Sequence, residues 1–249
     1  MSALSRTEGW SHYKQKWLPS MQYSLLATSL TSKQCKVIEQ QSNHVYLNAV
    51  GFPKSFPGEM VTAPRTAGGV GFRSLMVEQG SFHTVKTLIS HGRKDSGQLS
   101  LTLNIAYRWY HLYTGLRYHP FQHGQTSVSY VPQGWIKATQ DFLAASDLSV
   151  HWQTMQQLPP RRLQDRCLMA DANKKTYTKG RLNHINNCRL YLRVEYLSDV
   201  CNQAGTHILT EATEWHNPRT ISKPTKQFPK QACPGKKQWA IFRKFLRTT

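Results

Sequence analysis

The chain has 249 residues, and its 39% hydrophobic and 11% aromatic content is enough to bury a core and argues against wholesale disorder. Its 32 Lys and Arg residues face only 13 Asp and Glu residues, so the net charge is +19. Such an excess opposes compact folding unless a polyanion offsets it, and no run approaches the roughly 18 apolar residues of a membrane-spanning helix, so nucleic acid is the preferred polyanion over a membrane surface.

Helical periodicity begins close to the N-terminus. Residues 8–18 place Trp10, Tyr13 and Trp17 on one stripe of a helix. Pro19 follows directly, and because proline lacks an amide hydrogen and clashes with the preceding turn, it is predicted to end that helix.

A second helix is predicted to begin near Thr31 or Ser32, because both residue types are favoured N-caps. The segment 51–71 follows, and its density of proline and glycine predicts an ordered loop rather than a helix or a strand. Apolar residues at helical spacing then resume over 75–91 and again over 97–115, which predicts two further helices.

The second half of the chain is also predicted to be mostly helical. A short helix is expected from Pro132 to Leu143, and LSVHWQ at 148–153 is a candidate strand. The two prolines at 159–160 indicate a linker, after which the longest helix is expected over about 177–200. The fold class predicted from these elements is mainly α, without an internal repeat.

The C-terminal segment carries the clearest functional signal. From residue 215 onward there are nine Lys or Arg residues and no acidic residue. Residues 215–237 lack periodicity and predict an extended tail, whereas 236–249 predict a basic amphipathic helix. The positive charges indicate phosphate binding. The interleaved aromatic residues, Trp239, Phe242 and Phe245 among them, either cover the core or stack on bases.

Phosphoryl-transfer chemistry has no visible site. Catalytic magnesium needs clustered carboxylates, and the acidic residues here are scattered, with no Asp-Asp pair. GGVGF at 68–72 matches neither a P-loop nor a dinucleotide fingerprint. It is either a tight turn into a helix, or a turn whose backbone amides grip a phosphate with help from Arg65 and Arg73. No catalytic residue and no cofactor are predicted.

A zinc site is an alternative that the sequence leaves open. Two histidines and two cysteines give the pattern H-x3-C-x12-C-x5-H, formed by His184, Cys188, Cys201 and His207. Zinc accepts these ligand types, but the order and spacing match no standard finger, and the other reading is a buried cysteine with surface histidines. The five cysteines are odd in number and widely spaced, which favours reduced thiols and an intracellular protein of the nucleus or cytoplasm.

The residues also resemble a known protein family. The segment 51–93 contains FP and AP pairs, then GGVGFRSLMVEQG at 68–80 and LISHGR at 88–93. It is similar to the region just after the polymerase palm in reverse transcriptases of protist retrotransposons, which typically reads proline, Gly-Gly-Leu-Gly, Glu-Gln-Gly and a helix ending in His-x-Arg. WLPSMQYSLLATSLTSKQC at 17–35, INNCRLYLRVEYLSDV at 185–200 and KKQWAIFRKFLRTT at the C-terminus resemble other stretches of the same polyproteins.

This resemblance implies that the first part of the chain is thumb-like. With the linker and tail above, the predicted domains are a thumb-like helical bundle over 1–158 with the Gly/Pro-rich loop at 51–71, a second helical segment over 159–214, and a basic tail over 215–249 that ends in the amphipathic helix. The helices over 75–91 and 97–115 are expected to lie against a template–primer duplex. The palm and fingers domains of the parent polyprotein are the implied protein partners. The catalytic aromatic-x-Asp-Asp motif has no counterpart here, so the expectation is a C-terminal fragment or a truncated gene.

The predicted phosphate contacts fall into two groups. One surrounds the Gly-rich turn and the helix that follows it, and consists of Arg65, Gly68, Gly69, Gly71, Arg73, Lys86, His91 and Arg93. The other lies on the terminal helix, and consists of Lys236, Lys237, Arg243, Lys244 and Arg247. The rival hypotheses are a free-standing or zinc-dependent enzyme of unknown type, and a decayed gene product with no selected function.

Overall fold

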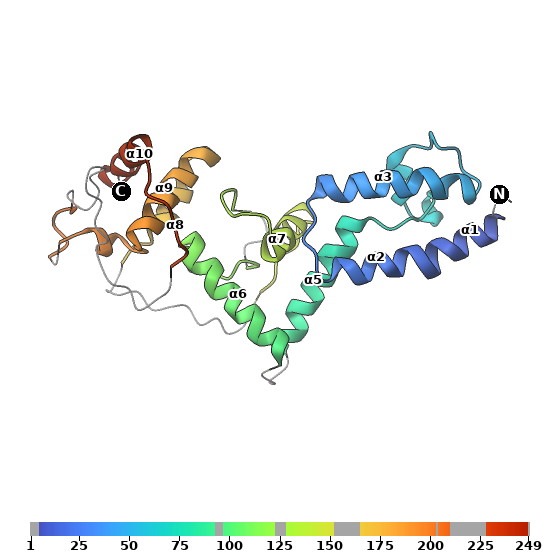
Figure 1. Cartoon of the computed structure of the whole chain (residues 1–249), viewed down its shortest axis with the longest axis horizontal. Helices are drawn as coiled ribbons and strands as arrows, with labels where there is room; N and C mark the ends of the chain where they lie inside the picture. The colour runs from blue at the N-terminus through green and yellow to red at the C-terminus, as the bar shows by residue number, and fades with distance from the viewer. Residues whose placement is uncertain are drawn as a thin grey trace. The chain divides into compact units, whose positions relative to one another are not determined.

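A computed structural model describes residues 5–92, 97–122, 128–151, 165–202, 204–209 and 228–248, apart from the side chains of residues 91 and 92. Over these residues the chain is mainly helical, as predicted, and its β pairing consists of isolated bridges (Figure 1). The chain forms two compact units. The first combines Met1–Ser100 with Gln133–Leu148, and the second combines Leu101–Pro132 with Ser149–Thr249.

This division differs from the predicted domain boundaries. It arises because α7 (Trp135–Ala145) packs against α5 (Leu75–Gly92) and so joins the first unit. The contact is close: a Cβ added at Gly80 would lie 1.9 Å from Cγ of Phe142. A contact between residues this far apart in sequence leaves no signal in local periodicity.

The prediction that Pro19 ends the first helix is wrong. Helical structure continues from α1 (Arg6–His12) through a π-helical turn, Tyr13–Trp17, into α2 (Leu18–Leu25). In the π turn the amide of Leu18 donates to the carbonyl of Tyr13, five residues back. This wider turn places Pro19 in the first turn of a new α-helical stretch, where a missing amide hydrogen is tolerated.

The aromatic stripe of the first helix packs in the core of the first unit. Tyr13 is buried and stacks on Phe72 at a ring-centroid distance of 4.3 Å and on Trp17 at 5.3 Å. Tyr46 adds an edge contact to Tyr13 at 5.4 Å, and Trp10 adds one to Phe72 at 5.3 Å. Such pairs contribute about 0.5–1.5 kcal/mol each beyond their buried area. Aromatic contacts with Phe72 therefore pack the first helix against the Gly-rich segment.

α3 (Ser32–Ala49) begins where the sequence predicts. Thr31 is its N-cap: the Thr31 hydroxyl accepts from the amide of Gln34, and the Gln34 side chain accepts from the amide of Thr31. The predicted loop at 51–71 contains two short helical turns, α4 (Gly58–Thr62) and a 3-10 turn at Arg65–Ala67, so the prediction of continuous loop needs correction. These turns are too short for a periodicity signal.

Two polar side chains of α5 hold the segment that joins α2 to α3. The Gln79 amide accepts from the backbone amide of Leu30 at 2.9 Å and donates to the carbonyl of the same residue at 3.0 Å. His83 lies one turn further along, with Nε2 3.1 Å from the carbonyl oxygen of Leu25. The His83 ring is fully buried, and this burial lowers its pKa to about 4.

We expect the first unit to lose stability between pH 6.5 and about 4. The folded-state pKa of His83 is depressed, so the unfolded chain binds a proton first, and the stability lost by pH 4.5 is about 2–3 kcal/mol. Urea unfolding at several pH values measures this. The His83→Gln variant keeps a polar side chain but cannot titrate, so its stability must fall less steeply with acid than that of the parent; equal slopes would refute the assignment.

In the second unit, every carbonyl of the last turn of α6 (Gln98–Thr114) has a donor. The guanidinium of Arg189 donates to the carbonyls of Leu112 at 2.6 Å and Tyr113 at 2.8 Å. The His111 carbonyl accepts from the amide of Gly115, and the Thr114 carbonyl accepts from the hydroxyl of Tyr130. A fully buried arginine thus closes this helix end and places its positive charge at the negative end of the helix dipole.

The long helix predicted over 177–200 is shorter in the structure. α9 runs over Lys179–Leu192 and is preceded by α8 (Leu168–Lys174). Arg193 adopts a left-handed conformation with φ of 58°, and a 3-10 turn at Leu197–Val200 follows. The segment between α9 and this turn is held by one side chain: the Asp199 carboxylate accepts hydrogen bonds from the amides of residues 195 and 196. Neither glycine nor proline marks this end in the sequence.

The remaining predicted elements have mixed outcomes. The helices expected over 75–91 and 97–115 are α5 and α6, and the short helix after Pro132 is α7. Residues 148–151 of the candidate strand are not in a strand, while 152–153 and the predicted linker at 159–160 lie outside the described residues. No helix within the described ranges is long and apolar enough to cross a membrane.

Candidate nucleic-acid interface

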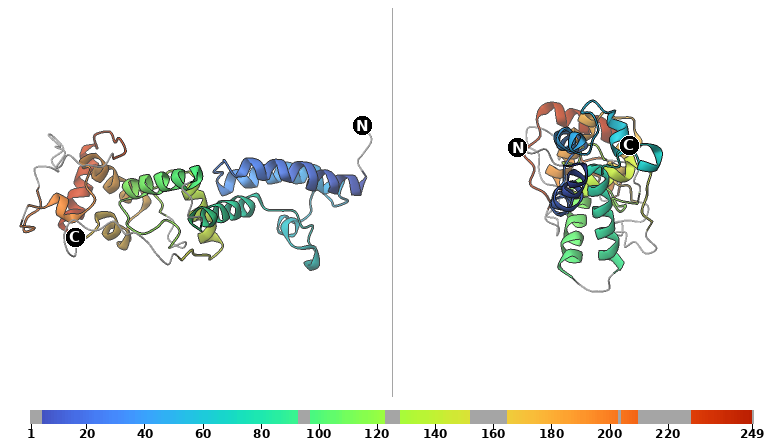
Figure 2. Two further views of the ribbon diagram at one scale, coloured as in Figure 1. Left: turned by 90° about the horizontal axis from the view of Figure 1, so that it is seen from below. Right: turned by 90° about the vertical axis from the view of Figure 1, so that its right-hand side faces the viewer.

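The positive charge of the chain is distributed unevenly between the two units. The second unit carries 20 of the 32 Lys and Arg residues but only 6 of the 13 Asp and Glu residues. Two of its described segments, 172–194 and 228–248, contain twelve basic residues and no acidic one. These segments include α9 and α10 (Lys236–Arg247), which pack against each other (Figures 1 and 2).

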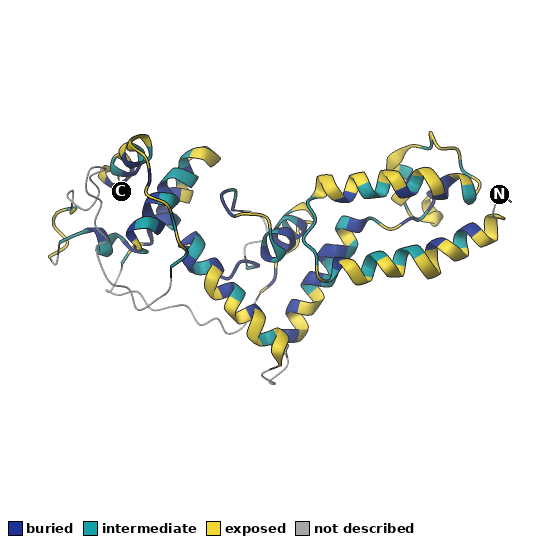
Figure 3. Cartoon of the chain, viewed as in Figure 1, coloured by how far each residue is buried: buried dark blue, intermediate teal, exposed yellow. Residues whose placement is uncertain are grey.

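The predicted terminal amphipathic helix is confirmed as α10. Trp239, Phe242 and Phe245 are fully buried, and the ring of Trp239 meets Tyr191 of α9 edge to face at 6.0 Å. These aromatic residues therefore cover the core, and the alternative that they stack on bases is contradicted, because a fully buried ring offers no face to a base. Figure 3 shows the resulting contrast of buried and exposed residues along α10.

The exposed side of α10 is basic. Lys237 and Lys244 lie two turns apart and Arg247 lies three residues further, so the three share one face, and all three are exposed. Lys236 is also exposed, whereas Arg243 is half-buried. We call these five residues the α10 basic face. Burial of the opposite apolar side fixes the orientation of this face, so the charges are presented by an anchored helix.

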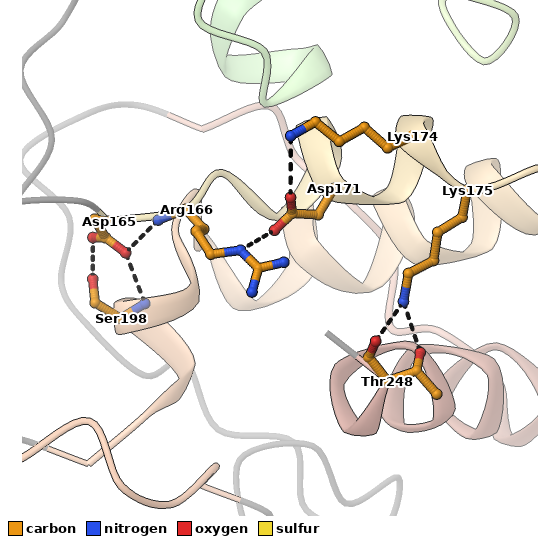
Figure 4. A network of polar contacts seen from close by, with 7 residues as sticks. All are labelled: Asp165, Arg166, Asp171, Lys174, Lys175, Ser198 and Thr248. Atoms are coloured by element: carbon orange, nitrogen blue, oxygen red, sulfur yellow. Dashed lines mark hydrogen bonds and ion pairs between the residues drawn. The ribbon is translucent and has the colours of Figure 1, made fainter.

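Contacts around α8 complete the anchoring (Figure 4). Nζ of Lys175 donates to the carbonyl oxygen of Thr248 at 2.8 Å and to its hydroxyl at 2.9 Å, which ties the C-terminus of α10 to the end of α8. The nearest acidic group on α8, Asp171, is buried and forms ion pairs with Arg166 at 2.9 Å and Lys174 at 4.0 Å. Its negative charge is compensated locally.

Asp165 makes a second local contact, on the far side of Arg166 (Figure 4). Its carboxylate accepts hydrogen bonds from the amide and the hydroxyl of Ser198, which joins the approach to α8 to the 3-10 turn at Leu197–Val200. The carboxylates of Asp165 and Asp171 thus both serve internal contacts.

Two of the three glycine amides that were candidates for phosphate binding are engaged within the Gly-rich turn itself. The amide of Gly68 donates to the carbonyl of Arg65 and that of Gly69 donates to Pro64, both at 3.0 Å. Gly68 and Gly71 have φ values of 79° and 80°, where glycine avoids strain. A Cβ at Gly69 would lie 2.1 Å from the carbonyl oxygen of Ala63. These glycines serve the tight turn, the first of the two interpretations of this segment.

The start of the following helix is already occupied by an anion. Oε1 of Glu39, from α3, accepts from the amide of Leu75 at 2.6 Å and from the hydroxyl of Ser74 at 3.2 Å. A carboxylate at a helix N-terminus satisfies the unpaired amides and the positive end of the dipole. The predicted phosphate site at this helix start is therefore filled by the protein itself.

The basic residues near this turn are exposed but engaged. The Arg65 guanidinium lies 3.8 Å from the ring centroid of Trp10, and its Nε donates to the carbonyl of Val70. Arg73 pairs with Glu78 at 3.3 Å. Lys86 is exposed on α5. The side chain of His91 and the whole of Arg93 lie outside the described residues.

The four candidate zinc ligands are not brought together. Cys188 is fully buried, and burial raises the pKa of its thiol, which opposes the thiolate that zinc requires. Nδ1 of His184 lies 3.2 Å from the side-chain amide of Gln238, and His207 is exposed. Among the described residues, no group of three or more His, Cys, Asp and Glu is placed to hold a metal ion.

Sequence reasoning missed the contribution of the residues before α10. Lys174 and Lys179 are exposed and belong to the acid-free stretch 172–194. The sequence did contain a signal for them: the stretch 172–194 has basic residues and no acidic one, whereas an ordinary solvated surface mixes both signs. No protein-family model, no curated protein and no solved structure matches the chain.

Proposed function

We propose that the chain binds the phosphate backbone of nucleic acid through the exposed basic residues of α8, α9 and α10. The observation that carries this proposal is the absence of any acidic residue from 172–194 and 228–248, which together hold eleven Lys and Arg residues that are exposed or half-buried, besides the buried Arg189. A surface of one sign is costly to a folded protein unless a polyanion neutralises it. Phosphate contacts gain affinity because they release condensed counterions.

The binding is independent of base sequence. Lysine and arginine contacts to phosphates carry no base information, and the aromatic residues of α10 that would supply stacking are buried. The protein therefore contributes affinity and position rather than chemistry. Its role is to hold a duplex or a single strand.

The motifs in the first unit extend this proposal. Their likeness to protist retrotransposon reverse transcriptases supports a role as the thumb and connection part of such an RNA-directed DNA polymerase, acting in the nucleus or cytoplasm. The partners are then a template–primer and the palm and fingers domains that supply the catalytic carboxylates. The carboxylate of Glu39, from α3, occupies the start of α5. The expected nucleic-acid contact is therefore at α10 rather than at the Gly-rich turn.

The salt dependence of binding tests the proposal. With about six to eight phosphates neutralised, the slope of log K against log salt concentration is expected to lie near −5 to −7 for duplex DNA. Fluorescence polarisation of a labelled duplex, titrated between low and physiological salt, measures this slope. A slope near zero would remove the proposal.

A matched pair of variants locates the surface. The triple variant K237Q/K244Q/R247Q is expected to weaken binding by about 10- to 100-fold at 0.1 M salt and to reduce the slope by about 2 to 3. The control K16Q/K33Q/K36Q removes the same charge from exposed positions of the first unit and is expected to leave the slope nearly unchanged. Equal losses in both variants would mean that net charge, and not the α10 basic face, drives binding.

A further inference from the structure

A cavity of about 490 Å³ lies within the second unit. One wall is a single face of α6, whose residues recur at spacings of three and four: Asn104, Tyr107, Arg108, His111 and Leu112. The facing wall is formed at the isolated bridge between Cys167 and Tyr196. A volume of this size is typical of sites for small organic ligands.

The positive groups of this cavity indicate an anionic ligand. Arg108 and Arg117 both line it, against the single carboxylate of Glu195. Nε of Arg117 is buried and meets no hydrogen-bond partner in the part of the chain that the structure describes. Leaving a buried charged donor unsatisfied costs about 1–3 kcal/mol or more, so a donor in this state at a cavity wall favours an acceptor supplied from outside.

The other walls suit a ring. Tyr107 and Leu116 are buried, and the Arg117 guanidinium lies 5.7 Å from the ring centroid of Tyr196. Apolar and aromatic surfaces beside two arginines match a ligand that joins a planar body to a phosphate. Asn104 adds an amide that can both donate and accept.

The cavity has the character of a binding site rather than a reaction site. Burial raises the pKa of the Cys167 thiol to about 11 and that of the Tyr196 hydroxyl to about 12. Both groups are therefore protonated and weakly nucleophilic at neutral pH. The chemistry available is hydrogen bonding and charge.

We propose that this cavity binds a nucleoside monophosphate, with the phosphate on Arg117 and Arg108 and the base against the apolar part of the cavity wall. The nucleotide is either free or the phosphorylated end of a polynucleotide. The first case is independent of the α10 basic face. The second rests on the proposed function, since the strand must then also reach the surface of the second unit.

Isothermal titration with adenosine monophosphate, adenosine and inorganic phosphate tests the site. Adenosine monophosphate is expected to bind at least about tenfold more tightly than either other probe, and R117M to weaken it by about tenfold or more. R117K retains the positive charge but lacks the planar set of guanidinium donors, and it is expected to recover part of the affinity. Such partial recovery separates a loss of recognition from a loss of folding. Equal binding of adenosine and its monophosphate, or no binding, overturns the proposal.

A second pair of probes identifies the source of the phosphate. Short oligonucleotides of one sequence, with a 5′-phosphate or a 5′-hydroxyl, are compared on the parent chain and on K237Q/K244Q/R247Q. If the 5′-phosphorylated oligonucleotide binds more tightly and R117M abolishes this preference, the cavity binds the end of a polynucleotide. If the two oligonucleotides bind equally, the cavity binds the free nucleotide. If the triple variant still binds adenosine monophosphate, the cavity site stands even when the proposed nucleic-acid binding by α10 fails.

Discussion

Replacing Arg189 with methionine is expected to lower the free energy of unfolding of the second unit by about 3–5 kcal/mol. The side chain is fully buried, and its donors reach the carbonyls of Leu112, Tyr113 and Val194 and the side chain of Asn186. Methionine fills a similar volume but donates nothing. The carbonyls of Leu112 and Val194 would then lose this donor, the carbonyl of Tyr113 would keep only the Asn186 amide, and the charge that opposes the helix dipole would be lost.

Amide hydrogen exchange followed by mass spectrometry locates the effect. Protection is expected to fall in α6 and α9 of Arg189→Met, while α3 and α5 of the first unit keep theirs. Arg193→Met is the control, because it removes the same charge from an exposed side chain just beyond the same helix. If both variants lost the same stability, the effect would come from net charge rather than from the buried donors.

Arg189 also shows where sequence reasoning stops. The interior of α9 was predictable because apolar spacing is a local property of the chain. Its partners Leu112 and Tyr113 lie 77 and 76 residues earlier, and no pattern near Arg189 indicates them. A single basic residue on a basic segment reads as surface charge, yet this one is buried and closes another helix.

The candidate interface also has a part that the sequence predicts and a part that it does not. The apolar and basic sides of α10 were predictable from spacing alone. The turn at the Gly-rich segment was one of two interpretations, but the group that occupies the start of α5 was not predictable, because it is Glu39, 36 residues away from Leu75. Without that contact a helix start preceded by glycines and arginines resembles an anion site. The cavity beside α6 was likewise invisible, since its two walls come from segments that only folding brings together.

Gly80→Ala is expected to lower the free energy of unfolding of the first unit by about 2–3 kcal/mol, although alanine is the better helix former. The added Cβ would lie 1.9 Å from Cγ and 2.4 Å from Cδ1 of the Phe142 ring, so the ring or α7 must move. Gly180→Ala, on α9, is the control: a Cβ there meets no atom within 4 Å, and the helix is expected to gain stability by a few tenths of a kcal/mol.

A double-mutant cycle separates the collision from other causes. Phe142→Ala alone is expected to cost about 3–5 kcal/mol, because the ring is buried between α5 and α7. Once that ring is gone, the space against Gly80 is open, and Gly80→Ala is expected to become neutral or to stabilise by about 0.5–1 kcal/mol. Urea unfolding of the four proteins measures the coupling. If Gly80→Ala cost as much without the ring as with it, the contact between α5 and α7 would not be what requires glycine at this position.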